Sequence, residues 1–590
     1  MLYPQDNETR EVKDLSGIWR FKLDPKAEGR RGRWWSRPLD QTIAMPVPSS
    51  YNDVTQDPAL RSHVGDVWYE TVFRVTPSLA GRRVVLRFGS ACYSAKVWLN
   101  GKEAVEHAGG WLPFEAEVTG LLERDRDNRL TVVVNNVLDW TTLPPGEVKR
   151  LEDETRPEGY VTQEYFHDFF NYSGIHRPVK LYTTPSRFIS DLTVRTDVQG
   201  DLGLVSYAVE LSAPASVRTT LIDQAGTEVS RGQGAAGTLE VPGVRLWNSG
   251  MPYLYTLLVE TLCADGRPED CYRLPVGIRT IQVTRDAFLI NGAPFHFRGF
   301  GKHEDADIRG KGLDNIIMAK DFSLLRWMGA NSFRTSHYPY CEEIMDMADR
   351  EGIVVIDEMP AVGMHFFTET EAVFRPGRVG EETLAHHLLA AQELIQRDRN
   401  HPCVVMWSIA NEAATYEPAS GPYFRRVAER TRELDSSRPV TIVHANSSDA
   451  LRSTVGDLFE VVCVNEYHGW YLETSHLDLI PQRLRRELRQ VRERYGKPIL
   501  VTEFGAESIP GLHRDPPVMF TEEFQCEFLS RYFSVFDELP FVIGEHVWCF
   551  ADFATKQELS RVTGNRKGVF TRQRDPKAAA HLLRRRWTGR

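Results

Sequence analysis

The sequence contains no apolar run long enough to cross a bilayer, and its N-terminus (MLYPQDNETREVKDL) has no basic segment followed by an apolar stretch. A membrane span needs about 20 consecutive apolar residues, and a secretory signal places positive charge before an apolar core. We therefore expect a cytoplasmic protein with no membrane partner. Positive charge is in the minority, with 71 Lys and Arg against 81 Asp and Glu. The net charge of −10 argues against nucleic acid as a partner, and an anionic substrate would need a locally basic pocket.

The sequence also lacks paired cysteine motifs. No two of the eight cysteines form a CxxC motif or another spacing typical of a metal site, and several lie inside apolar runs such as VVCVNEY. We expect buried free thiols in a reducing compartment rather than disulfides. The residues are Cys92, Cys263, Cys271, Cys341, Cys403, Cys463, Cys526 and Cys549.

The first half of the chain contains many short β-branched or aromatic runs separated by turns. Because a single hydrophobic core stops growing near about 250–300 residues, a chain of 590 residues is expected to form about three domains. RVVLRFGS, AKVWLNG, RLTVVVNN and PVKLYTTP predict a jelly-roll-like β-sandwich over residues 1–185. DLTVRTDV, VSYAVELS and YLYTLLVETL predict a smaller, immunoglobulin-like sandwich over residues 186–280, with RGQGAAGT as a loop.

From residue 281 to residue 590 the pattern changes, and apolar strand-like runs alternate with helical segments such as PQRLRRELRQVRERYG. Strands alternating with helices are typical of a parallel sheet. Eight such runs over a stretch of this length predict a C-terminal (β/α)8 TIM barrel. The runs are FHFRGFG, NSFRTSHY, IVVIDEM, VVMWSIANE, VTIVHAN, VVCVNEYH, ILVTEFG and VIGEHVWCF.

Two glutamates stand at the ends of predicted barrel strands. Glu412 follows VVMWSIA and Asn411, and Glu503 follows ILVT. Active sites of such barrels lie at the C-terminal ends of the strands, so the two carboxyl groups should face each other across one mouth. A glycosidic bond is cut by a pair of this kind, and the distance between the two carboxyl groups decides between retention and inversion. The sequence leaves that distance open.

The residues then carry a resemblance. WSIANE, TEFGAES and two sandwiches before a barrel resemble glycoside hydrolase family 2. The chain is similar to the β-glucuronidases of that family throughout, from DLSGIWRF through YFHDFFNYSGIHRPV, GFGKHEDADIRGKG and RTSHYPY to GEHVWCFADFAT and GNRKGVFTRQRDPK. The resemblance implies a retaining exo-β-D-glucuronidase, which hydrolyses β-D-glucuronides to glucuronate and an aglycone alcohol through a covalent glycosyl-enzyme intermediate. It also implies a homo-oligomer, a tetramer, and no cofactor.

The roles of the residues around the scissile bond follow from the same resemblance. Glu412 matches the general acid/base and Glu503 the nucleophile, while Asn411 matches a residue that bonds the sugar 2-hydroxyl. Tyr467, in NEYHGWY, matches a tyrosine that hydrogen-bonds the nucleophile. In this chain the motif has His468 where the bacterial pattern commonly has a second tyrosine, so a polar contact of that neighbour is not carried over.

Asn565 and Lys567, in GNRKG, lie two positions apart in a glycine-flanked loop. By composition the loop could be a solvated basic segment or a carboxylate site, since charge-assisted hydrogen bonds are about twice as strong as neutral ones. The resemblance implies that the pair recognises the uronate carboxylate, with Arg561 and Tyr471 as further contacts. We expect this cluster to supply the locally positive pocket.

Three more residues match sugar contacts of the family: Asp168 from the first sandwich, and His337 and Trp548 after the second and eighth strands. His303-Glu304-Asp305 is not expected to hold a metal, because its spacing provides no ligand set and the mechanism needs none.

A segment after Pro360 (AVGMHFFTETEAVFRPGRVGEET) is rich in phenylalanine. It follows the third predicted strand, so we expect exposed aromatic rings beside the mouth, which bind either the aglycone or a partner subunit. The rings are those of Phe366, Phe367 and Phe374.

Two other functions remain open at this point. The same scaffold could serve as a β-galacturonidase or β-galactosidase, although Asn565 and Lys567 argue against a neutral sugar. A catalytically inactive carbohydrate-binding protein is the second alternative, and the presence of both Glu412 and Glu503 argues against it.

Overall fold

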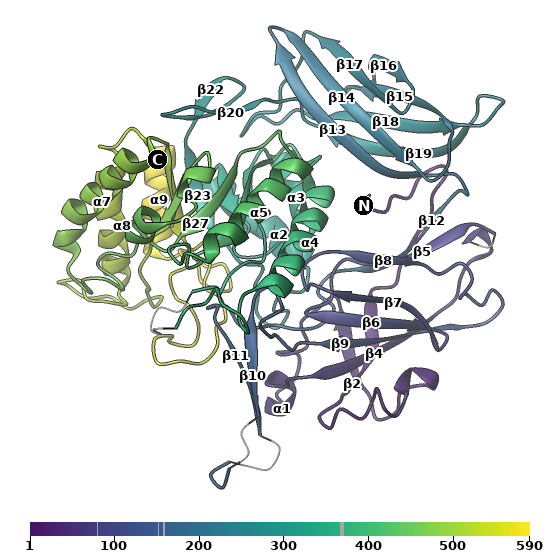
Figure 1. Cartoon of the computed structure of the whole chain (residues 1–590), viewed down its shortest axis with the longest axis horizontal. Helices are drawn as coiled ribbons and strands as arrows, with labels where there is room; N and C mark the ends of the chain where they lie inside the picture. The colour runs from purple at the N-terminus through teal and green to yellow at the C-terminus, as the bar shows by residue number, and fades with distance from the viewer. Residues whose placement is uncertain (80, 151–152, 157–159, 366–370, 590) are drawn as a thin grey trace.

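The structure is a computed structural model that describes residues 1–79, 81–150, 153–156, 160–365 and 371–589. Figure 1 shows two β-sheet units at the N-terminal side and a barrel surrounded by helices, with the chain colour running from purple through green to yellow. Two sandwiches followed by a TIM barrel are the fold class that the sequence predicts, and that prediction is confirmed.

The first unit is a sandwich of two antiparallel sheets, with strand orders β1-β12-β5-β8 and β3-β2-β4-β9-β6-β7. Its core lies between the sheets, where alternate side chains such as Phe21, Tyr69 and Val97 are buried together. A two-stranded hairpin, β10-β11, runs downward beside this sandwich in Figure 1. The elements are β1 (Val12–Asp14), β2 (Gly17–Leu23), β3 (Ile43–Val47), α1 (Pro58–Arg61), β4 (Asp66–Phe73), β5 (Arg83–Phe88), β6 (Ser94–Leu99), β7 (Lys102–Ala108), β8 (Phe114–Glu117), β9 (Asn128–Asn135), β10 (Gly146–Arg150), β11 (Val161–Tyr165) and β12 (Val179–Thr184).

The second unit is a smaller sandwich, with sheets β13-β14-β17 and β16-β15-β18-β19. The expected loop RGQGAAGT is wrong for most of its length, because it forms the end of β16 and the start of β17. Its glycines serve packing: a Cβ atom at Gly232 or Gly237 would lie 2.6 or 2.8 Å from the Tyr207 hydroxyl oxygen. The strands are β13 (Ile189–Gln199), β14 (Leu202–Leu211), β15 (Ser216–Ile222), β16 (Glu228–Gln233), β17 (Ala236–Pro242), β18 (Tyr255–Leu262) and β19 (Pro268–Val276).

The third unit begins with a small sheet, β20-β21-β22, and continues as a closed barrel of parallel strands β23 to β30. The helices between the strands cover the outside of the barrel (Figure 1). The strands are β20 (Ile281–Val283), β21 (Phe288–Ile290), β22 (Ala293–Phe295), β23 (Phe297–Gly301), β24 (Ser332–Arg334), β25 (Val354–Glu358), β26 (Val404–Asn411), β27 (Val440–His444), β28 (Val462–Asn465), β29 (Ile499–Glu503) and β30 (Val542–Trp548). The helices are α2 (Asn315–Met328), α3 (Glu342–Glu351), α4 (Glu381–Asp398), α5 (Ser420–Leu434), α6 (Ser447–Arg452), α7 (Ile480–Tyr495), α8 (Glu522–Phe536) and α9 (Ala578–Thr588).

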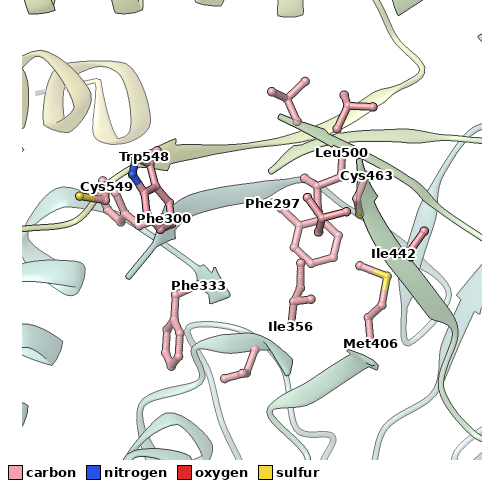
Figure 2. Close-up of a cluster of buried hydrophobic side chains, with 14 of the residues drawn as sticks. Phe297, Phe300, Phe333, Ile356, Met406, Ile442, Cys463, Leu500, Trp548 and Cys549 are labelled. Carbon is pink, nitrogen blue, oxygen red and sulfur yellow. The ribbon is translucent and has the colours of Figure 1, made fainter. Parts of the chain in front are cut away.

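A continuous apolar core holds the barrel strands in place. Figure 2 shows Phe297, Ile356, Met406, Ile442 and Leu500 from five different strands among a cluster of buried side chains. Interiors packed at this density resist displacement of their elements. The C-terminal ends of the strands therefore present their side chains from a rigid base.

Two further sequence predictions concern the whole chain. All eight cysteines are free, and six of them are buried, as expected. Within the described ranges, no helix is both long enough and apolar enough to span a membrane.

Candidate active site

Glu412 stands directly after β26, where the barrel strand ends. Its backbone is left-handed, with a φ of 52°, a conformation that few non-glycine residues adopt. The Glu412 amide N–H donates to the Val443 carbonyl oxygen at 2.8 Å, which fixes this turn against β27. The side chain is thereby directed into the mouth, where Asn465 Nδ2 donates to Glu412 Oε1 at 2.6 Å.

The protonation of Glu412 follows from its surroundings. Burial, and then the negative charge of Glu503, raise the pKa of Glu412 to about 8, while the hydrogen bond from Asn465 acts in the opposite direction. Thr502 Oγ1 donates to Asn465 Oδ1 at 2.9 Å and so orients the amide with its Nδ2 toward Glu412. At neutral pH this carboxyl group carries a proton that it can donate.

Glu503, at the end of β29, has a different environment. Arg334 donates to Glu503 Oε1 at 2.5 Å, and the Tyr467 hydroxyl donates to Glu503 Oε2 at 2.8 Å. Arg334 is fully buried and also donates to both carboxylate oxygens of Glu358, at 2.8 and 2.9 Å. Both oxygens of Glu503 thus accept hydrogen bonds, which orient the carboxylate within the mouth.

His337 and Trp548 form one wall beside these carboxyl groups. Their rings stack with centroids 5.0 Å apart. His337 Nδ1 lies 2.8 Å from Glu358 Oε1, and His337 Nε2 lies 3.7 Å from Glu503 Oε1. Asn411 Oδ1 accepts a hydrogen bond from Arg334 at 3.3 Å. The structure thus brings all six predicted residues of this part of the site together around the Arg334 guanidinium and Asn465.

The other five predicted residues gather in a second cluster. Arg561 donates to Asp168 at 2.9 Å and to the Tyr471 hydroxyl at 2.8 Å, and Asn565 Nδ2 donates to Asp168 at 2.8 Å. Lys567 Nζ donates to the Tyr471 hydroxyl at 2.8 Å. We call these five residues the uronate cluster, after the role that the resemblance implies. The cluster adjoins the residues around Glu503, because the rings of Tyr467 and Tyr471 are 5.0 Å apart.

A second carboxylate balances the charge of the uronate cluster. Glu507 is fully buried and accepts from Arg561 at 2.9 Å and from Lys567 at 3.2 Å. Burial acts to raise the pKa of Asp168, but Arg561 and Asn565 outweigh it, and that pKa lies below its usual value. Two cations thus face two carboxylates, so the expectation of a locally positive pocket is wrong. The cations are instead held in place by the carboxylates.

Asp168 reaches the barrel because the loop after β11 crosses between the two units. Phe169 forms a β-bridge with Thr555, and the Phe170 amide donates to the Ala554 carbonyl at 2.8 Å. Asp168 therefore comes from the first sandwich but stands in the mouth of the barrel.

The side chains of His303, Glu304 and Asp305 have different partners in the structure. His303 contacts the Tyr338 hydroxyl, Glu304 pairs with Arg177, and Asp305 pairs with Arg572. Within the described residues, the clusters of potential metal ligands lie at other positions.

The phenylalanine-rich segment differs from expectation in the part that the structure describes. Phe374 is buried, and its ring contacts those of Tyr423 and Phe424 at 5.3 and 5.5 Å. Phe374 belongs to the barrel core, where removal of its ring from water stabilises the fold. Phe366 and Phe367 lie outside the described residues.

Family models match the chain from end to end. "Glycosyl hydrolases family 2, sugar binding domain" matches residues 12–185, "Glycosyl hydrolases family 2" matches 187–279, and "Glycosyl hydrolases family 2, TIM barrel domain" matches 281–589. The chain belongs to glycosyl hydrolase family 2.

Relatives with known names cover nearly the whole length of this family 2 chain. It is 57% identical to a β-glucuronidase from Paenibacillus borealis, over all of this chain and 98% of the relative. The β-D-glucuronidase structure from Dictyoglomus thermophilum is 50% identical with a TM-score of 0.95, over 100% of this chain and 99% of that one. The Ruminococcus gnavus β-glucuronidase in complex with D-glucuronic acid is 38% identical with a TM-score of 0.93, over 99% of both chains.

Sequence reasoning overlooked four polar residues of this family 2 site: Arg334, Glu358, Asn465 and Glu507. Each lies within or next to the quoted strand ends: RTSHYPY, IVVIDEM, VVCVNEYH and TEFGAES. A polar or charged residue at or just after the end of a buried strand was the available signal, because such a residue rarely remains buried without a partner.

Proposed function

We propose that this chain is a retaining exo-β-D-glucuronidase, which releases glucuronate and an aglycone alcohol from β-D-glucuronides. The observation that carries the proposal is the asymmetry of two carboxyl groups in one mouth: the pKa of Glu412 is about 8, whereas Glu503 accepts from Arg334 and Tyr467. A carboxyl group that holds its proton, beside one that accepts hydrogen bonds on both oxygens, fits the acid and the nucleophile of a glycosidase. The names of the full-length relatives support glucuronides as substrates.

In the first step, the Glu503 carboxylate attacks the anomeric carbon while Glu412 gives its proton to the glycosidic oxygen, and the aglycone leaves as an alcohol. The Tyr467 hydroxyl then bonds a glycosyl ester oxygen in place of a carboxylate oxygen. In the second step, Glu412, now ionised, takes a proton from water as that water attacks the anomeric carbon. Glu503 leaves as a carboxylate, and the β configuration is restored. Asn411, His337 and Trp548 are proposed to contact the sugar.

The uronate cluster is proposed to bind the C6 carboxylate. Arg561, Asn565 and Lys567 carry N–H groups in addition to those used on Asp168, Glu507 and Tyr471. Because Asp168 and Glu507 already hold these side chains, little rotamer freedom is lost when a substrate binds. Charge-assisted hydrogen bonds to the carboxylate would distinguish a glucuronide from a glucoside.

Substrate comparison tests this assignment. The purified protein is assayed with chromogenic β-glucuronide, β-glucoside, β-galacturonide and β-galactoside. For Lys567→Met we expect kcat/KM for the glucuronide to fall by about 10- to 150-fold, the equivalent of one charged hydrogen bond of about 1.5–3 kcal/mol. The rate with the glucoside should change little. Lys556→Met is the matched control, because Lys556 lies in the same segment but donates to the Tyr165 carbonyl.

Three results would each contradict a part of the proposal. A tenfold preference of the wild-type protein for the galactoside or the galacturonide would assign it a different substrate. Release of an α-configured product, followed by proton NMR, would exclude retention. Loss of all turnover in Glu503→Ala is expected, and retained turnover would show that the nucleophile is another residue.

We also propose a cellular compartment, an oligomeric state and domain boundaries for this protein. Eight unpaired cysteines support a reducing compartment, the cytoplasm. The resemblance to the family supports a homo-oligomer, a tetramer, which light scattering after gel filtration can measure. Units 1–185, 186–280 and 281–590 are proposed as the domains.

A further inference from the structure

A second polar centre is formed around the residue after Tyr467, and it takes no part in the mechanism above. The ring of His468 is surrounded by Glu466, which follows β28, by Glu473, and by Glu487 of α7. His468 Nε2 is 2.9 Å from Glu487 Oε2 and 3.6 Å from Glu466 Oε2. His468 Nδ1 is 3.3 Å from Glu473 Oε2. We call these four residues the His468 cluster.

All three carboxylates of the His468 cluster point the oxygen Oε2 toward the imidazole ring. The Ser447 amide and hydroxyl donate to Glu466 Oε1, with the amide nitrogen at 3.1 Å. Arg483 lies 2.7 Å from Glu473 Oε1, and Arg486 lies 3.8 Å from Glu487 Oε1. In each case Oε1 faces a neighbouring donor or cation, and Oε2 lies within 3.6 Å of a ring nitrogen. Three oxygens thus converge on the two ring nitrogens.

The imidazole ring alone does not satisfy these oxygens. Each ring nitrogen can donate one hydrogen bond, but two carboxylate oxygens face Nε2. Glu466 is fully buried, and its Oε2 has no hydrogen-bond partner among the described residues. A buried carboxylate oxygen without a donor is costly, so a missing partner is indicated on the Nε2 side of the ring.

We propose that the His468 cluster binds a first-row divalent cation such as zinc, through His468 Nε2, Glu466 Oε2 and Glu487 Oε2. The candidate ligand atoms lie within 4.8 Å of one another. Tetrahedral bonds of about 2.1 Å place neighbouring ligands roughly 3.4 Å apart, close to the observed separations. His468 Nδ1 lies 3.3 Å from Glu473 Oε2, and a carboxylate at this position is the usual partner of a metal-bound histidine.

The other features of the cluster fit such a site. One imidazole with two carboxylates favours zinc or manganese over magnesium, which seldom binds nitrogen. The side chains of Glu487 and Glu473 are 17% and 23% exposed, so the ion and a fourth ligand, water, can enter from that side. The group Asp349, His401 and Cys403 differs, because the Asp349 oxygens are already occupied by His401 Nδ1 and the Cys403 amide.

The cation would act on the turn rather than on the substrate. The Tyr467 carbonyl accepts from the amides of Trp470 and Tyr471, both at 3.1 Å, so residues 467–471 form one compact turn. His468 lies on the outer side of that turn, and Tyr467 and Tyr471 lie on the inner side, at Glu503 and Lys567. Binding would tie the turn to α7 and position both tyrosines.

Calorimetry on the full-length protein, stripped with EDTA and titrated with zinc chloride, tests the proposal. One zinc per chain is expected. Glu487→Gln and His468→Asn should each weaken binding by at least about 100-fold, and Glu473→Gln by about 10- to 100-fold, since it removes the partner of a ligand. His513→Gln is the matched control, because His513 and Glu523 form an exposed pair without a third ligand.

Crystals soaked in zinc provide a second measurement that does not depend on the variants folding. An anomalous peak between His468, Glu466 and Glu487 is expected. Zinc binding of unchanged affinity in Glu487→Gln, or no peak at this position, would overturn the proposal. The inference is independent of the proposed substrate, since loss of zinc binding and loss of glucuronide turnover are measured separately.

Discussion

Asn465 is expected to set the alkaline limit of activity, although it is not one of the two proposed catalytic residues. Its Nδ2 donates to Glu412 Oε1 at 2.6 Å and stabilises the ionised form of that acid. Replacement by alanine removes this donor and leaves the burial of Glu412 and the charge of Glu503. The pKa of Glu412 in Asn465→Ala should therefore rise from its present value of about 8.

The size of this shift follows from the strength of the lost bond. A hydrogen bond to a charged group contributes about 1.5–3 kcal/mol. Since about 1.4 kcal/mol corresponds to one pKa unit, the shift should be about 1–2 units upward. A short bond to a buried carboxyl group places the expectation in the upper half of that range.

The pH dependence of kcat/KM measures the shift directly. Its alkaline limb reports the acid of the free enzyme and should move upward by about 1–2 pH units in Asn465→Ala, while the acid limb stays in place. Asn446→Ala is the matched control, since Asn446 caps α6. Neither limb of the pH profile of this variant should move. An unchanged alkaline limb, or a downward shift, would show that Asn465 does not control the proton on Glu412.

Three further predictions concern the same barrel. Glu412→Gln should reduce the loss of stability between about pH 5 and 8. The folded wild-type protein holds a proton on Glu412 up to about pH 8 that the unfolded chain has released, so wild-type stability falls as pH rises through this window. The melting temperature of the variant should therefore rise relative to that of the wild type toward pH 8. Arg334→Leu removes the guanidinium partner of both Glu358 and Glu503 and should cost about 3–5 kcal/mol in urea unfolding. A loss below 1 kcal/mol, about that of a surface pair, would contradict the pairing. Phe374→Ala should cost about 3–5 kcal/mol of stability with an unchanged KM, whereas a raised KM at full stability would place its ring at the aglycone.

The fold could be predicted because the local pattern and the global arrangement agree. Eight apolar runs in the third unit appear as β23 to β30 in the predicted order. RGQGAAGT was misread because glycine permits a turn but does not require one. Its glycines give space to the Tyr207 hydroxyl, which is 25 or more positions away in the chain, and a local pattern does not contain such a contact.

Strand position alone predicts that Glu412 and Glu503 lie in one mouth, but the side chains that contact them could not be predicted in this way. Arg334, Asn465 and Glu507 lie in motifs that were available to sequence reasoning. Their importance comes from partners on other strands: Arg334 of β24 bonds Glu503 of β29, and Asn465 of β28 bonds Glu412 after β26. Which strand ends meet, and through which atoms, depends on barrel closure and register, including the irregularity between Val464 and Asn465.

The charge balance of the uronate cluster changes how selectivity should be understood. An unpaired Arg561 and Lys567 would attract any anion, and they would also be costly to bury. Paired with Asp168 and Glu507, they form a neutral but strongly dipolar cluster whose remaining N–H groups point in fixed directions. A ligand gains from these groups only if its carboxylate reaches them in the correct orientation, which a sugar held by the adjacent catalytic pair can do. Selectivity for a uronate then depends on geometry more than on net charge, and it should persist at salt concentrations that screen a simple positive pocket.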